Sequence, residues 1–248
     1  MAKALIYTAL FGDLDRGLKE PLQEIPDCVF LCFTDKKDLK SDTWKIIHED
    51  AIPDFFTFGL PPEQFRYKDP RMKARLIKAI LPIRIRHFKI IDFFDKYENQ
   101  IYIWIDGSIQ LKQNPLPLIE GKMKDADILA FQHPDRQQLE DEALAAHVWR
   151  GTNLEEALFQ VATYRALGFT REEQKALTAT GFFFRRHSPQ MDFFNLSWIK
   201  EILLHTDRDQ LSVDYCIWKH KLKRNFIMGT YRRSPWIQYF PHPIVKPT

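Results

Sequence analysis

Short, dense apolar runs alternate along the chain with longer stretches of helical periodicity. The runs are too short for isolated helices and are bounded by turn residues, so they predict buried strands over 4–11, 29–33, 44–47, 101–105, 128–131 and 182–184. The strongest is Ile101–Ile105 (IYIWI), which is β-branched or aromatic throughout and stops at Asp106-Gly107.

Apolar residues at helical spacing predict helices over 71–81, 137–147, 154–167, 193–204 and 210–218. In the first of these, Lys73, Arg75 and Lys78 fall largely off the apolar stripe, on a face that is either solvated or able to hold a diphosphate. The tail after 218 is rich in proline and is predicted to be irregular. Strands that alternate with helices indicate an α/β fold with a mostly parallel central sheet flanked by helices.

Composition narrows the class of protein. The 248 residues show no linker and no internal repeat, so we expect a single domain over 1–248. Lys and Arg (36) nearly balance Asp and Glu (33), which argues against a nucleic-acid partner. No stretch approaches 18 consecutive apolar residues, so no transmembrane segment is expected.

The cysteines and the first residues of the chain indicate the cellular compartment of the protein. Cys28, Cys32 and Cys216 form neither a disulfide framework nor a CxxC motif, and the first two lie among apolar residues, as buried strand thiols do. The start MAKALIYTALFGD lacks the features of a signal peptide. We therefore expect a cytoplasmic protein, either free or peripheral to the inner face of the membrane. The sequence leaves the oligomeric state open.

The sharpest candidate site is Asp106-Gly107-Ser108. Ligands of α/β sheets bind beyond the carboxyl ends of strands, and Asp106 follows the most apolar strand. A carboxylate and a hydroxyl two residues apart suit a hard cation such as Mg²⁺ or Mn²⁺, which takes few protein oxygens together with substrate phosphates. The alternative is a simple turn that ends the strand.

Three further polar groups follow predicted elements. His133 and Arg136 come after the strand 128–131, and Glu140 and Glu142 begin the next helix, where acids can also simply complement the helix dipole. Arg185 and Arg186, with His187, follow the strand 182–184 and suit a phosphate or carboxylate, unless they form a solvated turn. In the cluster from Thr206 to Ser212, helix capping accounts for one residue but not for Asp209 and Gln210 as well.

Several motifs, in order, resemble a glycosyltransferase family long catalogued as a domain of unknown function, with plant (mucilage- and pectin-related) and bacterial members. The resemblance covers about 4–218 and rests on YTALFGDLD, FTD, PRMKAR, YIWIDGSI, HPDR with EDEA, Gln160 with Tyr164 and Gly168, GFFFRRH, FNLSW with Glu201, and RDQLS. More widely, the chain is similar to GT-A glycosyltransferases, including the retaining glycogenin-like group. The resemblance implies a Rossmann-like GT-A domain with a nucleotide-binding half at about 1–110 and an acceptor and catalytic half at about 111–248.

The resemblance also implies residue roles. Asp106 stands where the first Asp of the family's DxD motif lies, and Ser108 replaces the second, which leaves the metal requirement open; a late histidine, His242, would complete a Mn²⁺ or Mg²⁺ site. Asp209 and Gln210 resemble a DQ pair beside the transferring sugar, and Glu140 or Glu142 would bind or activate the acceptor. The groups implied to bind the donor are Tyr7, Thr8, Ala9, Arg71, Lys73, Asp106, Ser108, His133, Arg136, Arg185 and Arg186.

The expected function is transfer of a sugar from a nucleotide-sugar donor to a saccharide acceptor, metal-assisted, with retention of configuration, in surface polysaccharide synthesis. The alternative is a non-catalytic protein on the same scaffold that binds a carbohydrate or a nucleotide-sugar, which the missing second Asp favours. A nucleotidyltransferase would show a glycine-rich basic loop after the first strand, whereas FGDLDRG is acidic. The donor's sugar and nucleotide and the identity of the acceptor are not specified by these motifs.

Overall fold

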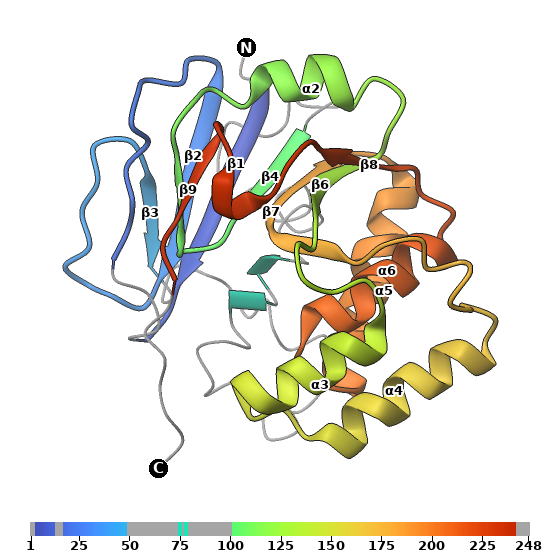
Figure 1. The fold of residues 1–248 in the computed structure, drawn as a ribbon. Coiled ribbons are helices and arrows are strands. Elements are labelled where there is room, and N and C mark those ends of the chain that lie inside the picture. Colours follow the sequence, from blue (N-terminus) through green and yellow to red (C-terminus); the bar gives the residue numbers. More distant parts are fainter. Residues whose placement is uncertain (1–2, 13–16, 49–73, 76, 79–100, 242–248) are drawn as a thin grey trace.

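The computed structural model describes residues 3–12, 17–48, 74–75, 77–78 and 101–241. Its centre is a seven-stranded sheet in the order β3-β2-β1-β4-β7-β6-β8 (Figure 1). The strands are β1 (Ala4–Leu10), β2 (Cys28–Thr34), β3 (Lys45–His48), β4 (Ile101–Ile105), β6 (Ile128–Gln132), β7 (Thr178–Arg186) and β8 (Arg224–Ile227). Among these seven, β7 alone runs against its neighbours β4 and β6. The expected mostly parallel sheet is therefore confirmed.

Strand direction decides where the site lies. The pairs β1–β2, β1–β4 and β2–β3 are all parallel, so their carboxyl ends share one edge of the sheet. Since β7 is antiparallel to β4, its early residues lie at that same edge, whereas Arg185 and Arg186 lie opposite Tyr102 and Ile101, at the start of β4.

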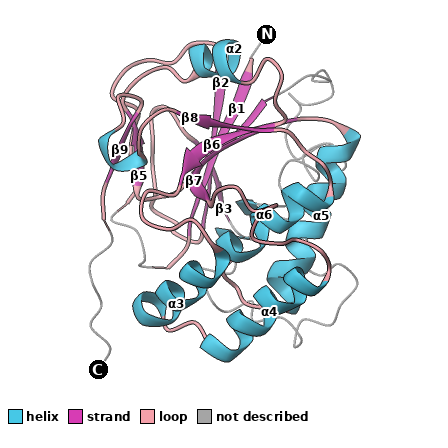
Figure 2. Cartoon of the chain, turned by 45° about the vertical axis from the view of Figure 1, so that its right-hand side comes forward, coloured by secondary structure: helices cyan, strands magenta, loops and turns pink. Residues whose placement is uncertain are grey.

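Five helices of the described part of the chain surround the sheet: α2 (Leu116–Lys122), α3 (Leu139–Arg150), α4 (Leu154–Ala166), α5 (Pro189–Leu204) and α6 (Asp209–Lys219). Figure 2 shows α2 at one end of the molecule and the α3–α4 pair at the other. Residues 74, 75, 77 and 78 are also helical. Helix α6 is tied to β7 because Asp214 accepts hydrogen bonds from the backbone N–H and the hydroxyl of Thr178.

The core has two halves, one on each face of the sheet, as the alternation along β1 requires. Leu5 and Tyr7 point into a cluster with α5 and α6 that contains Trp198. Ala4 and Ile6 point into a second cluster, which includes residues of α2. The thiols of Cys32 and Cys216 are buried and Cys28 is partly buried, and all three cysteines are free, in agreement with the sequence-based expectation.

Element positions follow the predicted ones closely, with exceptions in the tail. The chain after 218 was predicted to be irregular, but it forms β8, the short 3-10 helix η4 (Tyr231–Arg233) and β9 (Ile237–Tyr239). Strand β9 pairs with β5 (Ile109–Leu111), which directly follows the Asp106 turn. The prediction was wrong because three-residue strands carry almost no periodicity, and long-range pairing decides whether they form.

Candidate active site

Asp106 is held at the carboxyl end of β4 by the reversed strand β7. Its backbone N–H donates to the carbonyl of Gly181 at 2.8 Å, and Trp104 Nε1 donates to its Oδ1 at 2.5 Å. A Cβ atom at Gly181 would lie 2.9 Å from Asp106 Oδ2, so the carboxylate depends on a glycine at that position. The Asp106 side chain remains 42% exposed and can therefore meet a ligand.

A buried ammonium connects Asp106 to the start of α6. Lys78 Nζ lies 2.8 Å from Asp209 Oδ2 and 3.6 Å from Asp106 Oδ1, and its side chain is only 3% exposed. The ammonium also lies 5.4 Å from the ring centroid of Trp104 and 5.9 Å from that of Trp198. Lys78 is therefore an internal cation of the site and does not belong to a solvated helix face.

Asp209 is surrounded by donors. Its Oδ2 also accepts a hydrogen bond from Thr180 Oγ1 at 3.0 Å, and Arg75 Nε lies 4.0 Å from its Oδ1. Burial alone would raise the pKa of this carboxyl, but Lys78, Arg75 and Arg208 outweigh burial and hold the pKa of Asp209 well below its usual range. Asp209 is thus ionised at neutral pH.

Glu142 on α3 joins two arginines in the interior. Its Oε2 accepts from Arg136 Nε at 2.6 Å and its Oε1 from Arg208 Nε at 2.8 Å, while the Glu142 side chain is 1% exposed. Burial opposes ionisation, yet Arg208 and Arg136 hold the pKa of Glu142 below its usual range. Arg208 Nη2 also donates to Gln210 Oε1 at 2.7 Å, which links this group to α6.

His133 packs against the same arginine. The backbone N–H groups of Asp135 and Arg136 donate to His133 Nδ1, and Arg136 Nη2 lies 2.7 Å from its Nε2. Burial, together with the charge of Arg136, lowers the pKa of His133 to about 4. The imidazole is therefore neutral at neutral pH.

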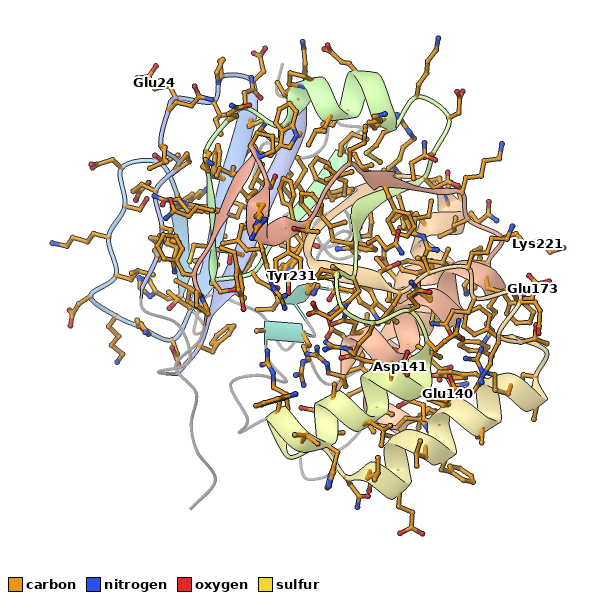
Figure 3. All side chains as sticks on the ribbon, viewed as in Figure 1. Glu24, Glu140, Asp141, Glu173, Lys221 and Tyr231 are labelled. Atoms are coloured by element: carbon orange, nitrogen blue, oxygen red, sulfur yellow. The ribbon has the colours of Figure 1, made fainter. Side chains whose placement is uncertain are left out.

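The structure brings six of the predicted site residues together. Asp106 and Asp209 form one network with Arg75, Lys78 and Asp207. His133, Arg136, Glu142 and Gln210 form a second network with Arg208, which is adjacent to Asp209 in the chain and interacts with it electrostatically. Glu140 joins neither network: its carboxylate pairs with Arg165 on α4 and with Arg171, and Figure 3 shows it at the start of α3 beside α4. Arg71, Lys73 and His242 lie outside the described residues.

Three of the residues predicted to bind the donor are buried or lie at the opposite end of β4 from Asp106. Tyr7 and Arg185 are fully buried. Both side chains donate to the backbone carbonyl of Lys78, and Arg185 also donates to Asn195, so they support the lysine from beneath and leave no surface for a donor. Arg186 lies beside Ile101, at the opposite end of β4 from Asp106, where it donates to the carbonyl of Met123. The sequence could not reveal the positions of Arg185 and Arg186 because it does not give the reversed direction of β7.

Other expectations stay predictions. Thr8 and Ala9 are each 3% exposed on β1. Ser108 is 5% exposed, and its carbonyl accepts from the backbone N–H of Phe240, so the residue holds the end of strand β9. The described residues contain no group of three or more His, Cys, Asp or Glu side chains that could hold a metal ion. The half-exposed carboxylate of Asp106 fits a divalent cation as a single protein ligand, beside oxygens that a substrate brings.

Sequence reasoning missed the central role of Lys78 and the contributions of Arg75, Asp207 and Arg208. Arg75 pairs with Asp207, and Lys78 pairs with Asp209. The available signal was the presence of two cations on one predicted helix and of two acids close together in the 206–212 cluster, which a charge-pairing argument could have joined.

A buried hydrogen-bond chain supports the loop before α6. Tyr164 Oη donates to Glu201, Gln160 Nε2 donates to Tyr164 Oη at 2.7 Å, and the hydroxyl of Thr206 donates to Gln160 Oε1 at 2.7 Å. Gln160 is completely buried. These motif residues therefore position the segment that carries Asp207, Arg208 and Asp209.

Comparisons with known proteins identify the family of the chain. A sequence model described as TOD1/MUCI70, glycosyltransferase-like domain matches residues 62–236. A protein of Arabidopsis thaliana named alkaline ceramidase TOD1 is 23% identical over 231 residues, which cover 84% of this chain and 46% of the relative. The chain thus spans about half the length of this curated relative. In the described part of the chain, no helix has the length and apolarity needed to cross a membrane. Because the family match covers most of the chain, the protein belongs to the TOD1/MUCI70 glycosyltransferase-like domain family.

Proposed function

We propose that the protein is a glycosyltransferase that moves a sugar from a nucleotide-sugar donor to a saccharide acceptor. The observation that carries this proposal is the buried ammonium of Lys78 between Asp106 and Asp209, at the carboxyl ends of the strands. In α/β sheets this edge is where ligands bind. The glycosyltransferase-like family supports the same class of reaction.

The charges of the two networks suit departure of a diphosphate. When the bond between the sugar and the diphosphate breaks, negative charge grows on the leaving group, and preorganised cations stabilise that charge best in a site that excludes water. Lys78, Arg75, Arg136 and Arg208 are all at least three-quarters buried and fixed by carboxylates. A divalent cation bound with the donor would be held by Asp106 and would add to this neutralisation.

The remaining groups take roles that fit their contacts. The anomeric carbon becomes oxocarbenium-like, so nearby carboxylate and amide oxygens lower its energy. Asp106 offers an exposed carboxylate for this purpose, and the placement of Asp209 and Gln210 beside the sugar stays a prediction from the motif resemblance. Glu142, with both oxygens bound by arginines, orients those arginines and is poorly suited to activate an acceptor. Retention of configuration and a part in surface polysaccharide synthesis stay predictions, and proton NMR of the first-formed product tests the stereochemistry.

The same test distinguishes two other possible functions. One is a non-catalytic protein that binds the donor or a carbohydrate, which is favoured by Ser108 in place of the family's second Asp. The other is cleavage of ceramide, which the name of the Arabidopsis relative suggests. The match covers 46% of that relative. Ceramide cleavage is therefore kept for this chain only as an alternative that the same test must distinguish.

The test is release of free nucleoside diphosphate from a panel of nucleotide-sugars, with and without Mn²⁺ and saccharide acceptors. We expect release that increases with one acceptor class. Donor binding without release in every combination supports the binding protein instead. Fatty acid released from ceramide, with no turnover of any nucleotide-sugar, supports the hydrolase.

A further inference from the structure

We infer that Arg136 and Arg208, held side by side by Glu142, form a two-arginine clamp for the diphosphate of the donor. This inference rests on the proposed function, because it assigns the group that binds the leaving phosphates. The clamp is built from three separate segments: Arg136 follows β6, Glu142 belongs to α3, and Arg208 precedes α6.

Glu142 orients both guanidinium groups because it binds their Nε atoms. Each Nε donates to a different oxygen of Glu142, at 2.6 Å from Arg136 and 2.8 Å from Arg208. Each Nη2 has one further neighbour, His133 for Arg136 and Gln210 for Arg208. Within the described part of the chain, neither Nη1 atom has a hydrogen-bond partner. The arginine side chains are 23% and 14% exposed, so these N–H groups can reach a ligand.

Two features of this group favour an anion. Arg136 and Arg208 share the single carboxylate of Glu142, and neutral His133 adds no charge, while the acids Asp209 and Asp106 also act on Arg208. Arg208 is also the N-cap residue of α6, an eleven-residue helix whose positive dipole end lies at this point. Two guanidinium groups on one carboxylate, beside a helix N-terminus, therefore favour a bound anion.

An unpartnered donor points to the same ligand. Gln210 is 6% exposed, and its Oε1 accepts from Arg208, but its buried Nε2 has no hydrogen-bond partner among the described residues. A buried amide without a partner costs free energy, so such groups usually meet a ligand or water. Gln210 therefore adds an unpartnered donor next to Arg208.

A diphosphate matches these donors better than a single carboxylate does. Guanidinium groups bind phosphate oxygens in a bidentate manner, and two of them offer more donors than one carboxylate can accept. Since an acidic sugar on the acceptor is also an anion, the experiment must separate the two sources.

The experiment is calorimetric titration of the whole chain, in chelator, with inorganic pyrophosphate, with uridine, guanosine, cytidine and thymidine diphosphates, with the free nucleosides, and with glucuronate. Arg136→Gln and Arg208→Gln are each expected to weaken the affinity for pyrophosphate and for the preferred nucleoside diphosphate by about ten- to a hundredfold, as loss of a charge-assisted pair should. Binding of the nucleoside should not change. Arg171→Gln, which removes a largely exposed arginine paired with Glu140, is the matched control and should bind like wild type.

Folding is checked by circular dichroism and thermal unfolding. If a single variant unfolds because Glu142 loses one of its two partners, Arg136→Lys and Arg208→Lys keep the positive charge beside Glu142 but lose the planar guanidinium fork, and their affinity for pyrophosphate should still fall. Any of three results overturns the inference: unchanged diphosphate affinity in folded variants, no diphosphate binding by wild type, or variants that lose only the binding of glucuronate. Titration does not require turnover. If diphosphate binding depends on both arginines but no donor is turned over, the clamp is supported and only the proposed function fails.

Discussion

Replacement of Lys78 by methionine tests whether a buried ammonium organises the site. The substitution keeps an unbranched side chain of similar length but leaves Asp209 without its 2.8 Å partner. Removal of one partner of a buried ion pair costs about 3–5 kcal/mol, because the other charge stays buried. Thr180 still donates to Asp209 and Arg75 stays at 4.0 Å, which favours the lower end of that range.

Loss of the cation–π contacts with Trp104 and Trp198 adds about 0.5–1 kcal/mol each, so the free energy of unfolding should fall by about 4–5 kcal/mol in total. For a chain of this length that corresponds to a melting temperature lower by about 8–20 °C. Urea titration and thermal unfolding measure both quantities. The matched control Lys124→Met, at an exposed position, should stay within about 0.5 kcal/mol of wild type.

A second substitution identifies the cause. Lys78→Met/Asp209→Asn removes the stranded charge and should recover a large part of the lost stability. A Lys78→Met protein that unfolds within about 1 kcal/mol of wild type would show that the ammonium does not stabilise the two carboxylates, and the description of the site would be wrong.

Three further outcomes are expected. Gly181→Ala places a methyl group 2.9 Å from Asp106 Oδ2, so transfer should fall about tenfold or more in a folded protein, and unchanged initial rates would contradict the contact. The pKa of His133 is lowered from 6.5 to about 4, so the unfolded chain takes up the proton first as pH falls. Stability should then decrease by up to about 3 kcal/mol between pH 6.5 and 4, and urea midpoints of His133→Gln should lack that part of the pH dependence. Tyr164→Phe removes the hydroxyl that donates to Glu201 and should cost about 1–3 kcal/mol by thermal unfolding, while an unchanged melting temperature would argue against the buried chain.

The sequence predicted much of the fold because most elements have strong local patterns. The strand Ile101–Ile105 matches its prediction residue for residue, and α4 differs from its predicted range by one residue. Strand β9 and helix α2 were not predicted, because three and seven residues give too little periodicity and depend on partners distant in the chain.

The candidate site was predicted in part for a similar reason. Asp106, Glu142 and Asp209 stand at the ends of recognisable elements, so their motifs were visible. Arg185 has the same motif character, but the antiparallel direction of β7 carries it into the core beneath Lys78. Side-chain pairing across the sheet, which no single motif encodes, decides which charged residues meet a ligand.

The most direct test of the central claim compares nucleoside diphosphate release by wild type and by Asp106→Ala. The preferred donor and acceptor are used, and circular dichroism confirms that the variant is folded. Because Asp106 is the half-exposed carboxylate at the centre of the site, we predict a decrease in turnover of about a hundredfold or more. Near-normal turnover by a well-folded Asp106→Ala protein would contradict the claim that transfer occurs at this edge of the sheet.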